Sequence, residues 1–154
     1  MSSHQLAAVE ATLTKSLIAW SAASVVLGTA LAVKGHVSDD RRVKDFGRQT
    51  AAWGAVDAAI AGFGLLSQRR RGIQSATEVQ GQIRKLRNLL VINSVADIGY
   101  IASGAAVVGR NSKGKSALRM SAGDGMAIIV QGAFLLVLDV SQAVRLKEPS
   151  KIVA

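Results

Sequence analysis

Lysine and arginine are absent from four long stretches of this sequence. All 19 Lys and Arg residues lie outside residues 16–33, 49–68, 88–109 and 120–144. A soluble helical domain alternates charged and apolar residues at the helical period, whereas here the two kinds are segregated along the chain. Roughly 20 apolar residues in a helix cross the hydrocarbon core of a bilayer. The pattern therefore predicts an all-α fold, a bundle of four transmembrane helices.

We expect residues 1–154 to form a single membrane domain surrounded by the lipid bilayer. The predicted spans are about 14–34, 48–68, 87–109 and 119–145, with an amphipathic segment at about 75–87. Ser75-Ala76-Thr77-Glu78 is typical of a helix-starting capping box, and apolar residues recur after it at spacings of three and four. This segment either lies on the membrane surface, runs directly into the third span, or forms a solvated loop.

Small residues recur four apart within the predicted spans. Such faces allow helices to approach closely in a membrane. The faces are Ser24, Gly28 and Ala32 in the first span, Gly54, Ala58 and Gly62 in the second, and Gly99 and Ser103 in the third. They predict tight packing between helices.

A polar residue lies near the midpoint of each charge-poor stretch. These residues are Ser24, Asp57, Asp97 and Gln131. A carboxylate at the centre of a membrane helix costs about 2.5–3.5 kcal/mol on insertion scales. No Lys, Arg or His lies in any of the four stretches to neutralise the two acids. Each acid must therefore be protonated, share a proton, bind a cation or face water.

Neighbouring residues extend this polar layer into a predicted ligand- or ion-binding site. Helical spacing places Asn93 and Tyr100 on the face of Asp97, Trp53 on the face of Asp57, and Trp20 one turn from Ser24. The predicted site residues are Asp57, Asp97, Asn93, Tyr100, Trp53, Gln131, Trp20 and Ser24. The alternative is that these side chains only link helices by hydrogen bonds, with a neutral Asp57 bonded to Asn93 or Tyr100. Asp124 and Asp139, near the ends of the last stretch, are expected at the membrane interface.

Several chemistries are excluded by composition. The chain has no cysteine, and its two histidines, His4 and His36, lie outside the predicted spans. A haem held by two histidines within the membrane and a metal site of the His/Cys type are therefore not expected, and no cofactor is predicted. No phosphate-binding loop or catalytic triad is present, so we do not expect an enzyme. The net charge of +9 fits basic loops against anionic lipid, and nucleic acid is not an expected partner.

The two halves of the chain show a weak repeat of a helical hairpin. Arg48-x-Thr50-Ala51-x-x-Gly54 aligns with Arg119-x-Ser121-Ala122-x-x-Gly125. The chain also resembles a family of small bacterial four-helix membrane proteins without assigned activity. The residues that carry this likeness are Trp53-Gly54-x2-Asp57, Asn93-x3-Asp97-x2-Tyr100-x3-Gly104, Gly123-x-Gly125 and Gln131-Gly132-x-Phe134-Leu135-x3-Asp139. The resemblance implies no reaction, and the chain departs from it at position 57, where Asn is expected.

The sequence is consistent with two functional hypotheses. The first is proton- or cation-linked transport of a small molecule or ion, by a homo-oligomer such as a dimer because four helices enclose little space. The alternative is a non-enzymatic binding or accessory subunit that holds a lipid or hydrophobic ligand, or docks on a larger membrane complex. The resemblance implies a bacterial inner membrane, and the basic run 69–71 beside the second span favours cytoplasmic termini.

Overall fold

The computed structural model describes residues 3–70, 75–112 and 120–146, and every regular element in these ranges is an α-helix. The helices are α1 (Ser3–Val37), α2 (Arg41–Arg69), α3 (Ala76–Ser112) and α4 (Ala122–Arg145). All four are long and apolar enough to cross a membrane. The predicted all-α four-helix bundle is confirmed, and each helix contains most or all of one predicted span.

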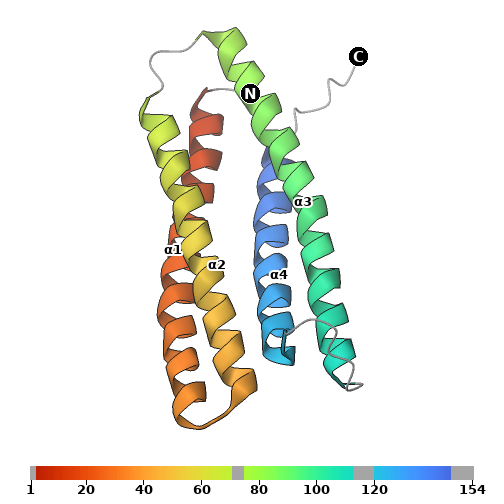
Figure 1. Cartoon of the computed structure of the whole chain (residues 1–154). Coiled ribbons are helices and arrows are strands. Elements are labelled where there is room, and N and C mark those ends of the chain that lie inside the picture. Colours follow the sequence, from red (N-terminus) through yellow and green to blue (C-terminus); the bar gives the residue numbers. More distant parts are fainter. Residues whose placement is uncertain (1–2, 71–74, 113–119, 147–154) are drawn as a thin grey trace.

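The bundle consists of two antiparallel hairpins, α1–α2 and α3–α4 (Figure 1). The hairpins meet chiefly where α2 packs against α4, while α1 touches α3 and α4 only lightly. The start of α1 and the end of α4 lie at one end of the bundle, which we call the termini end (Figure 1). The α1–α2 connection lies at the opposite end, which we call the loop end.

The helix α3 begins at the capping box predicted from the sequence. The Ser75 backbone N–H donates to Glu78 Oε2 at 2.7 Å, and the Glu78 N–H donates to Ser75 Oγ at 3.3 Å. The hydrogen bonds from Ser75 lower the pKa of the Glu78 carboxyl, which lies outside the predicted span. This cap is therefore kept at neutral pH and lost as the pH falls through the lowered pKa. The helix then continues without a break, so the amphipathic segment runs directly into the third span.

Asp124 belongs to a second capping box, which the sequence analysis did not identify. The Ser121 N–H donates to Asp124 Oδ2 at 2.8 Å, and the Asp124 N–H donates to Ser121 Oγ at 3.3 Å, so α4 begins here. Asp124 is 2 % exposed and also pairs with Arg48 of α2 at 3.3 Å. This ion pair joins the two hairpins at the loop end.

The α1–α2 hairpin is held by contact between glycine backbones. A Cβ placed on Gly28 would lie 2.5 Å from the backbone nitrogen of Ala51 and 2.7 Å from the carbonyl oxygen of Gly47. Gly54 likewise faces Ser24. The predicted packing faces are thus confirmed at Ser24, Gly28 and Gly54, because only residues without bulk fit where the two backbones touch.

The far end of the second predicted small-residue face and the whole of the third do not pack against a helix. Nothing lies within 4 Å of a Cβ placed on Gly62 or Gly99, and Ser103 is exposed. The α3–α4 contact uses Gly104 and Gly125 instead, where each glycine meets the other's carbonyl oxygen. The prediction was wrong at these positions. Small residues four apart share one face of a helix, but their spacing does not indicate whether that face packs against another helix.

Apolar side chains lie mainly on the outside of the bundle. Among the described residues, twelve polar or charged residues are buried against ten hydrophobic ones, and the exposed set includes many Val, Ile and Leu side chains on all four helices. Such a distribution is the reverse of a soluble core and suits lipid as the surroundings. The main buried apolar cluster lies at the termini end, where Leu6 and Val9 of α1 meet Val79 and Ile83 of α3 beside Leu146.

Replacing Gly28 with Ala tests the backbone contact. The new methyl group overlaps the backbone of α2, so we expect a loss of about 1–3 kcal/mol in unfolding free energy from overpacking. Gly62→Ala is the matched control in α2, because its methyl group meets open space. It should leave stability unchanged or raise it by up to about 1 kcal/mol through helix propensity. Thermal unfolding in detergent measures both, and equal stability of the two variants would contradict the packing described here.

Candidate functional site

Gln131 connects three helices at the polar layer. This residue of α4 is 5 % exposed, and its Nε2 donates to Asp57 Oδ2 of α2 at 2.5 Å. Its Oε1 accepts from Trp20 Nε1 of α1 at 2.8 Å. The indole N–H is only a donor, so the amide oxygen must face Trp20 and the amide NH₂ must face Asp57. The carboxyl of Asp57, 1 % exposed, is therefore held in a defined position.

Aromatic rings flank this hydrogen-bonded group. Trp20 stacks on Phe134 of α4, with ring centroids 4.0 Å apart and an interplanar angle of 6°. Trp53 of α2 meets Tyr100 of α3 edge-on, with centroids 5.6 Å apart. Trp53 Nε1 is buried without a hydrogen-bond partner among the described residues. Phe134 was not predicted as a site residue, although it lies one turn from Gln131 in the sequence.

Asp97 is the buried acid of this site with the fewest hydrogen-bond partners among the described residues. It is 3 % exposed, and its Oδ2 is buried without a hydrogen-bond partner in the described part of the chain. Its carboxyl lies close enough to Asp57 for the two to interact electrostatically. A buried carboxyl oxygen without a partner loses the hydration that it has in water and gains nothing in return. A proton, water or cation at this position would remove that cost.

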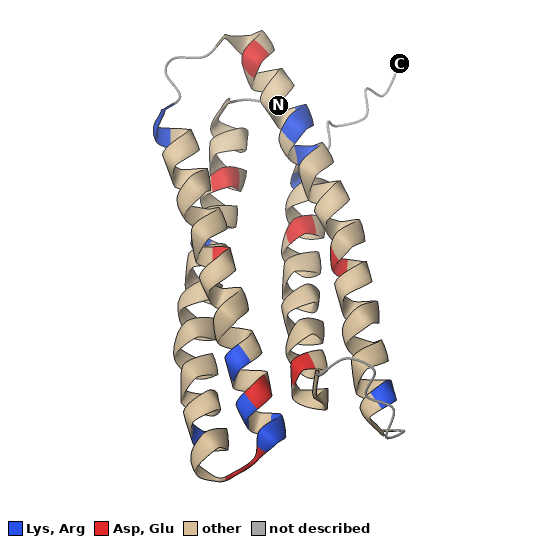
Figure 2. Ribbon diagram, in the orientation of Figure 1, with Lys and Arg blue, Asp and Glu red and all other residues tan. Residues whose placement is uncertain are grey.

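Asp139, which the sequence predicts at the membrane interface, is a third buried acid in the same region. It is 7 % exposed, is hydrogen-bonded to the Asn93 side chain and interacts electrostatically with Asp97. An acidic segment accordingly lies at a similar height in each of α2, α3 and α4 (Figure 2). The sequence feature that indicates this location is the spacing of seven residues between Gly132 and Asp139, which places both on one face of α4. That glycine packs against the backbone of Asp97, so residue 139 faces α3 as well.

The structure brings most of the predicted site residues together, in altered partnerships. Asn93 pairs with Asp139 rather than Asp57, and the partner of Asp57 is Gln131 rather than Asn93 or Tyr100. Ser24 is buried where α1 packs against Gly54, so its place is in the helix contact. Within the described ranges, no group of three His, Cys, Asp or Glu residues is arranged to hold a metal ion. Ligand binding by these residues stays a prediction.

Three ion pairs between described residues lie away from the three acids. They join Arg41 with Asp45, and Arg48 with both Asp45 and Asp124, near the loop end. Asp57, Asp97 and Asp139 take part in none of them. In the described part of the chain, the site is thus an acidic group flanked by aromatic rings and amides, outside these three ion pairs.

Comparison with known protein families gives a match for this chain. Residues 16–140 match the model described as "Family of unknown function (DUF6992)". The chain belongs to this family. The DUF6992 match includes Asp57, Asp97 and Asp139, and the family's description assigns no activity. No curated protein and no solved structure shows significant similarity to the chain.

Replacing Gln131 with Leu tests whether its amide holds the layer together. The change leaves the Trp20 N–H and the Asp57 carboxyl without their partner, so we expect a loss of about 1–3 kcal/mol in unfolding free energy. Gln142→Leu is the matched control, because Gln142 lies on the same helix, is 3 % exposed and bonds only to its neighbour Ser141 among the contacts seen. Thermal unfolding and tryptophan fluorescence in detergent compare the two. An unchanged melting temperature for Gln131→Leu alongside wild-type fluorescence would contradict this role.

Proposed function

We propose that this protein is an integral membrane protein of the bacterial inner membrane that carries out proton- or cation-linked transport of a small molecule or ion. The observation that supports this best is Asp97, whose carboxyl is buried beside Asp57 and Asp139 with an unpartnered oxygen. Acids within membrane helices mark ion and proton pathways in other proteins. An enzymatic role and a nucleic-acid partner are not part of the proposal.

A purely structural role accounts poorly for three acids. Hydrogen bonds between membrane helices need only an amide or a hydroxyl, and contribute about 0.6 kcal/mol on average. Gln131 already supplies such a link through its amide. A carboxyl group adds the ability to release a proton and to attract a cation, at a higher cost of insertion. The chain has this insertion cost at three positions, Asp57, Asp97 and Asp139. Three such residues favour a role that uses the charge of the carboxyl group.

The proposed orientation places both termini in the cytoplasm. Ten Lys and Arg residues belong to the termini side and nine to the loop side, so the count alone decides little. The run Arg69-Arg70-Arg71 directly follows the second span and favours the cytoplasm at the termini side. Four helices enclose little space, so the proposed working form is a homo-oligomer, such as a dimer, within the lipid bilayer.

A second candidate function is supported by a groove on the outside of the α3–α4 hairpin. The groove has a volume of about 300 Å³, and its walls are apolar except for Arg87 and Ser94. Val91, Val95 and Val140 are among the apolar residues that line it. An acyl chain beside an anionic headgroup suits such a surface. The alternative function is therefore a membrane binding or accessory subunit that holds a lipid or docks on a larger complex.

The double variant Asp57→Asn, Asp97→Asn tests the transport proposal. Proteoliposomes with a trapped pH dye would receive a membrane potential, or a gradient of potassium, sodium or tetraethylammonium. We expect the native protein to move protons under at least one of these conditions, and the double variant to fall to the level of empty liposomes, because Asn can neither release a proton nor carry charge.

Asp39→Asn is the control for this experiment. Asp39 is exposed at the loop end and has a φ of 53°, which Asn also tolerates. The Asp39→Asn variant also loses one carboxylate, and it should move protons at the rate of the native protein. Native-level proton movement by the double variant, or none by the native protein under any gradient, would contradict the proposal.

A further inference from the structure

A cavity of about 350 Å³ lies in the termini half of the bundle, and all four helices contribute to its wall. It lies between the apolar cluster at the termini end and the polar layer: Leu13 and Leu90 border the first, while Ala61 and Asn93 are one turn from Asp57 and Asp97. By the share of volume that water occupies in the liquid, it holds roughly ten waters. A hydrated alkali cation or a small organic ammonium ion therefore fits within it.

The polar lining of this cavity suits a cation. Its polar residues are Glu10, Thr14, Ser67, Gln68, Asn93 and Asp139, and none of its lining residues is Lys, Arg or His. Gln68 Nε2 donates to Thr14 Oγ1 at 3.4 Å across the α1–α2 contact. Carboxyl, hydroxyl and amide oxygens are the ligands that hard cations prefer. Each of the four helices contributes at least one of these polar residues, and the remaining lining is apolar.

The cavity wall leads directly to the unpaired acid. Asp139 lines the cavity and interacts electrostatically with Asp97, which in turn interacts with Asp57. Asp97 Oδ2 is the buried oxygen that has no partner among the described residues. The three carboxyls thus form a series that begins at the cavity and ends at the hydrogen bond between Asp57 and Gln131.

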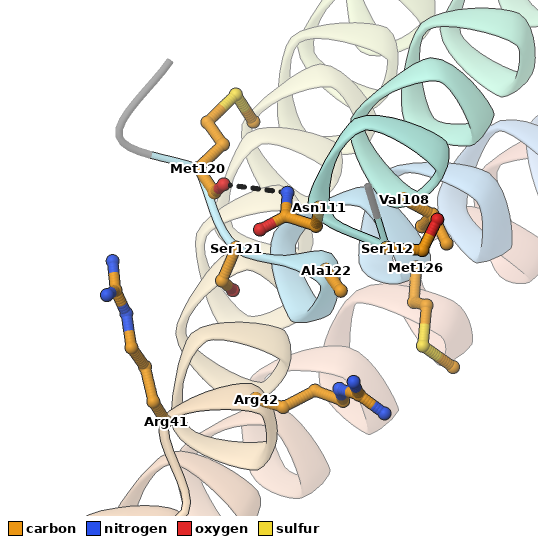
Figure 3. A pocket seen from close by; sticks show the side chains of 9 residues that line it. All are labelled: Arg41, Arg42, Val108, Asn111, Ser112, Met120, Ser121, Ala122 and Met126. Atoms are coloured by element: carbon orange, nitrogen blue, oxygen red, sulfur yellow. Dashed lines mark hydrogen bonds between the residues drawn. The ribbon is translucent and has the colours of Figure 1, made fainter. Parts of the chain in front are cut away.

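In the loop half of the bundle, helix backbones touch at several glycines. Gly28 and Gly104 touch the backbones of α2 and α4, and a Cβ on Gly123 would overlap the backbone of Arg42. The hollow at the loop end, about 390 Å³, lies at the surface between the starts of α2 and α4 (Figure 3). Its described lining includes Arg41 and Arg42 and no acidic residue, a charge that disfavours cations.

We propose that the termini-end cavity is a binding site for a small cation, and that cations reach Asp97 and Asp57 through it and not from the loop end. This inference deepens the proposed function by giving the ligand class and the side of entry. It rests on the proposed function only in assuming that the acids exchange a cation or proton with water. The location of the cavity and its charge can be tested without any transport measurement.

Cysteine accessibility tests this directly, because the natural chain contains no cysteine. Ala61→Cys lies on the cavity wall, one turn from Asp57 toward the termini end. Ala127→Cys is the matched control, one turn from Gln131 toward the loop end, and both alanines are 2 % exposed. The full chain in nanodiscs, which leave both membrane faces open, would be treated with a trimethylammonium methanethiosulfonate and with its anionic sulfonate counterpart. Rates are divided by those of each reagent with a free thiol in solution.

We expect the cationic reagent to label Ala61→Cys at least ten times faster than Ala127→Cys. We also expect its advantage over the anionic reagent at residue 61 to fall several-fold when Asp139→Asn is added. Gly64→Cys provides a second cavity position, since nothing lies within 4 Å of a Cβ there, and it carries the test if Ala61→Cys does not fold. Equal labelling of both ends, faster labelling at residue 127, or a preference for the anionic reagent would each overturn the inference.

These outcomes separate the inference from the proposed function. Selective cationic labelling at residue 61 without any proton movement in proteoliposomes would support the cavity site and contradict transport. Proton movement that depends on Asp57 and Asp97, with residue 61 unreactive, would support transport and overturn the cavity as the way in.

Discussion

The contact between α2 and α4 determines how the two hairpins combine, and the Gln131 amide is its central interaction. Because the Trp20 indole can only donate, the amide has one orientation available, and its NH₂ group must point at Asp57. Helices α1, α2 and α4 are thereby tied together at one depth. Gly132, next in the chain, lets the backbone of α3 approach at Asp97. The positions of both acids thus follow from two adjacent residues of α4.

The fold was predictable because the surroundings impose it. Lipid cannot hydrogen-bond the backbone, so apolar stretches of this length must be helical. The absence of Lys and Arg marks where they lie, and four such stretches give four helices. Depth was predictable for the same reason, since distance along a helix converts directly into height in the bundle. The alignment of Asp57, Asp97 and Gln131 near one level therefore came from the sequence.

The partners of each residue could not be predicted, because they depend on the order of helices around the bundle. Depth along the helices alone allows a neutral Asp57 to bond to Asn93 or Tyr100 of α3. In the structure α2 packs against α4, so Gln131 lies at Asp57 and Asn93 pairs with Asp139. Small-residue faces had the same ambiguity: Gly28 meets a helix and Gly99 meets none. Only packing between side chains on different helices decides such choices.

The acids of the loop end provide an internal comparison for those of the polar layer. Asp45 and Asp124 are as buried as Asp97, yet each pairs with Arg48, whose own side chain reaches solvent. The chain therefore neutralises buried carboxyls with arginine where a long side chain can keep its charge in water. Among the described residues, no ion pair includes Asp97, and its electrostatic partners on α2 and α4 are the acids Asp57 and Asp139. In the proposed function a proton or cation takes this place at Asp97, and the cavity that Asp139 lines is its proposed path.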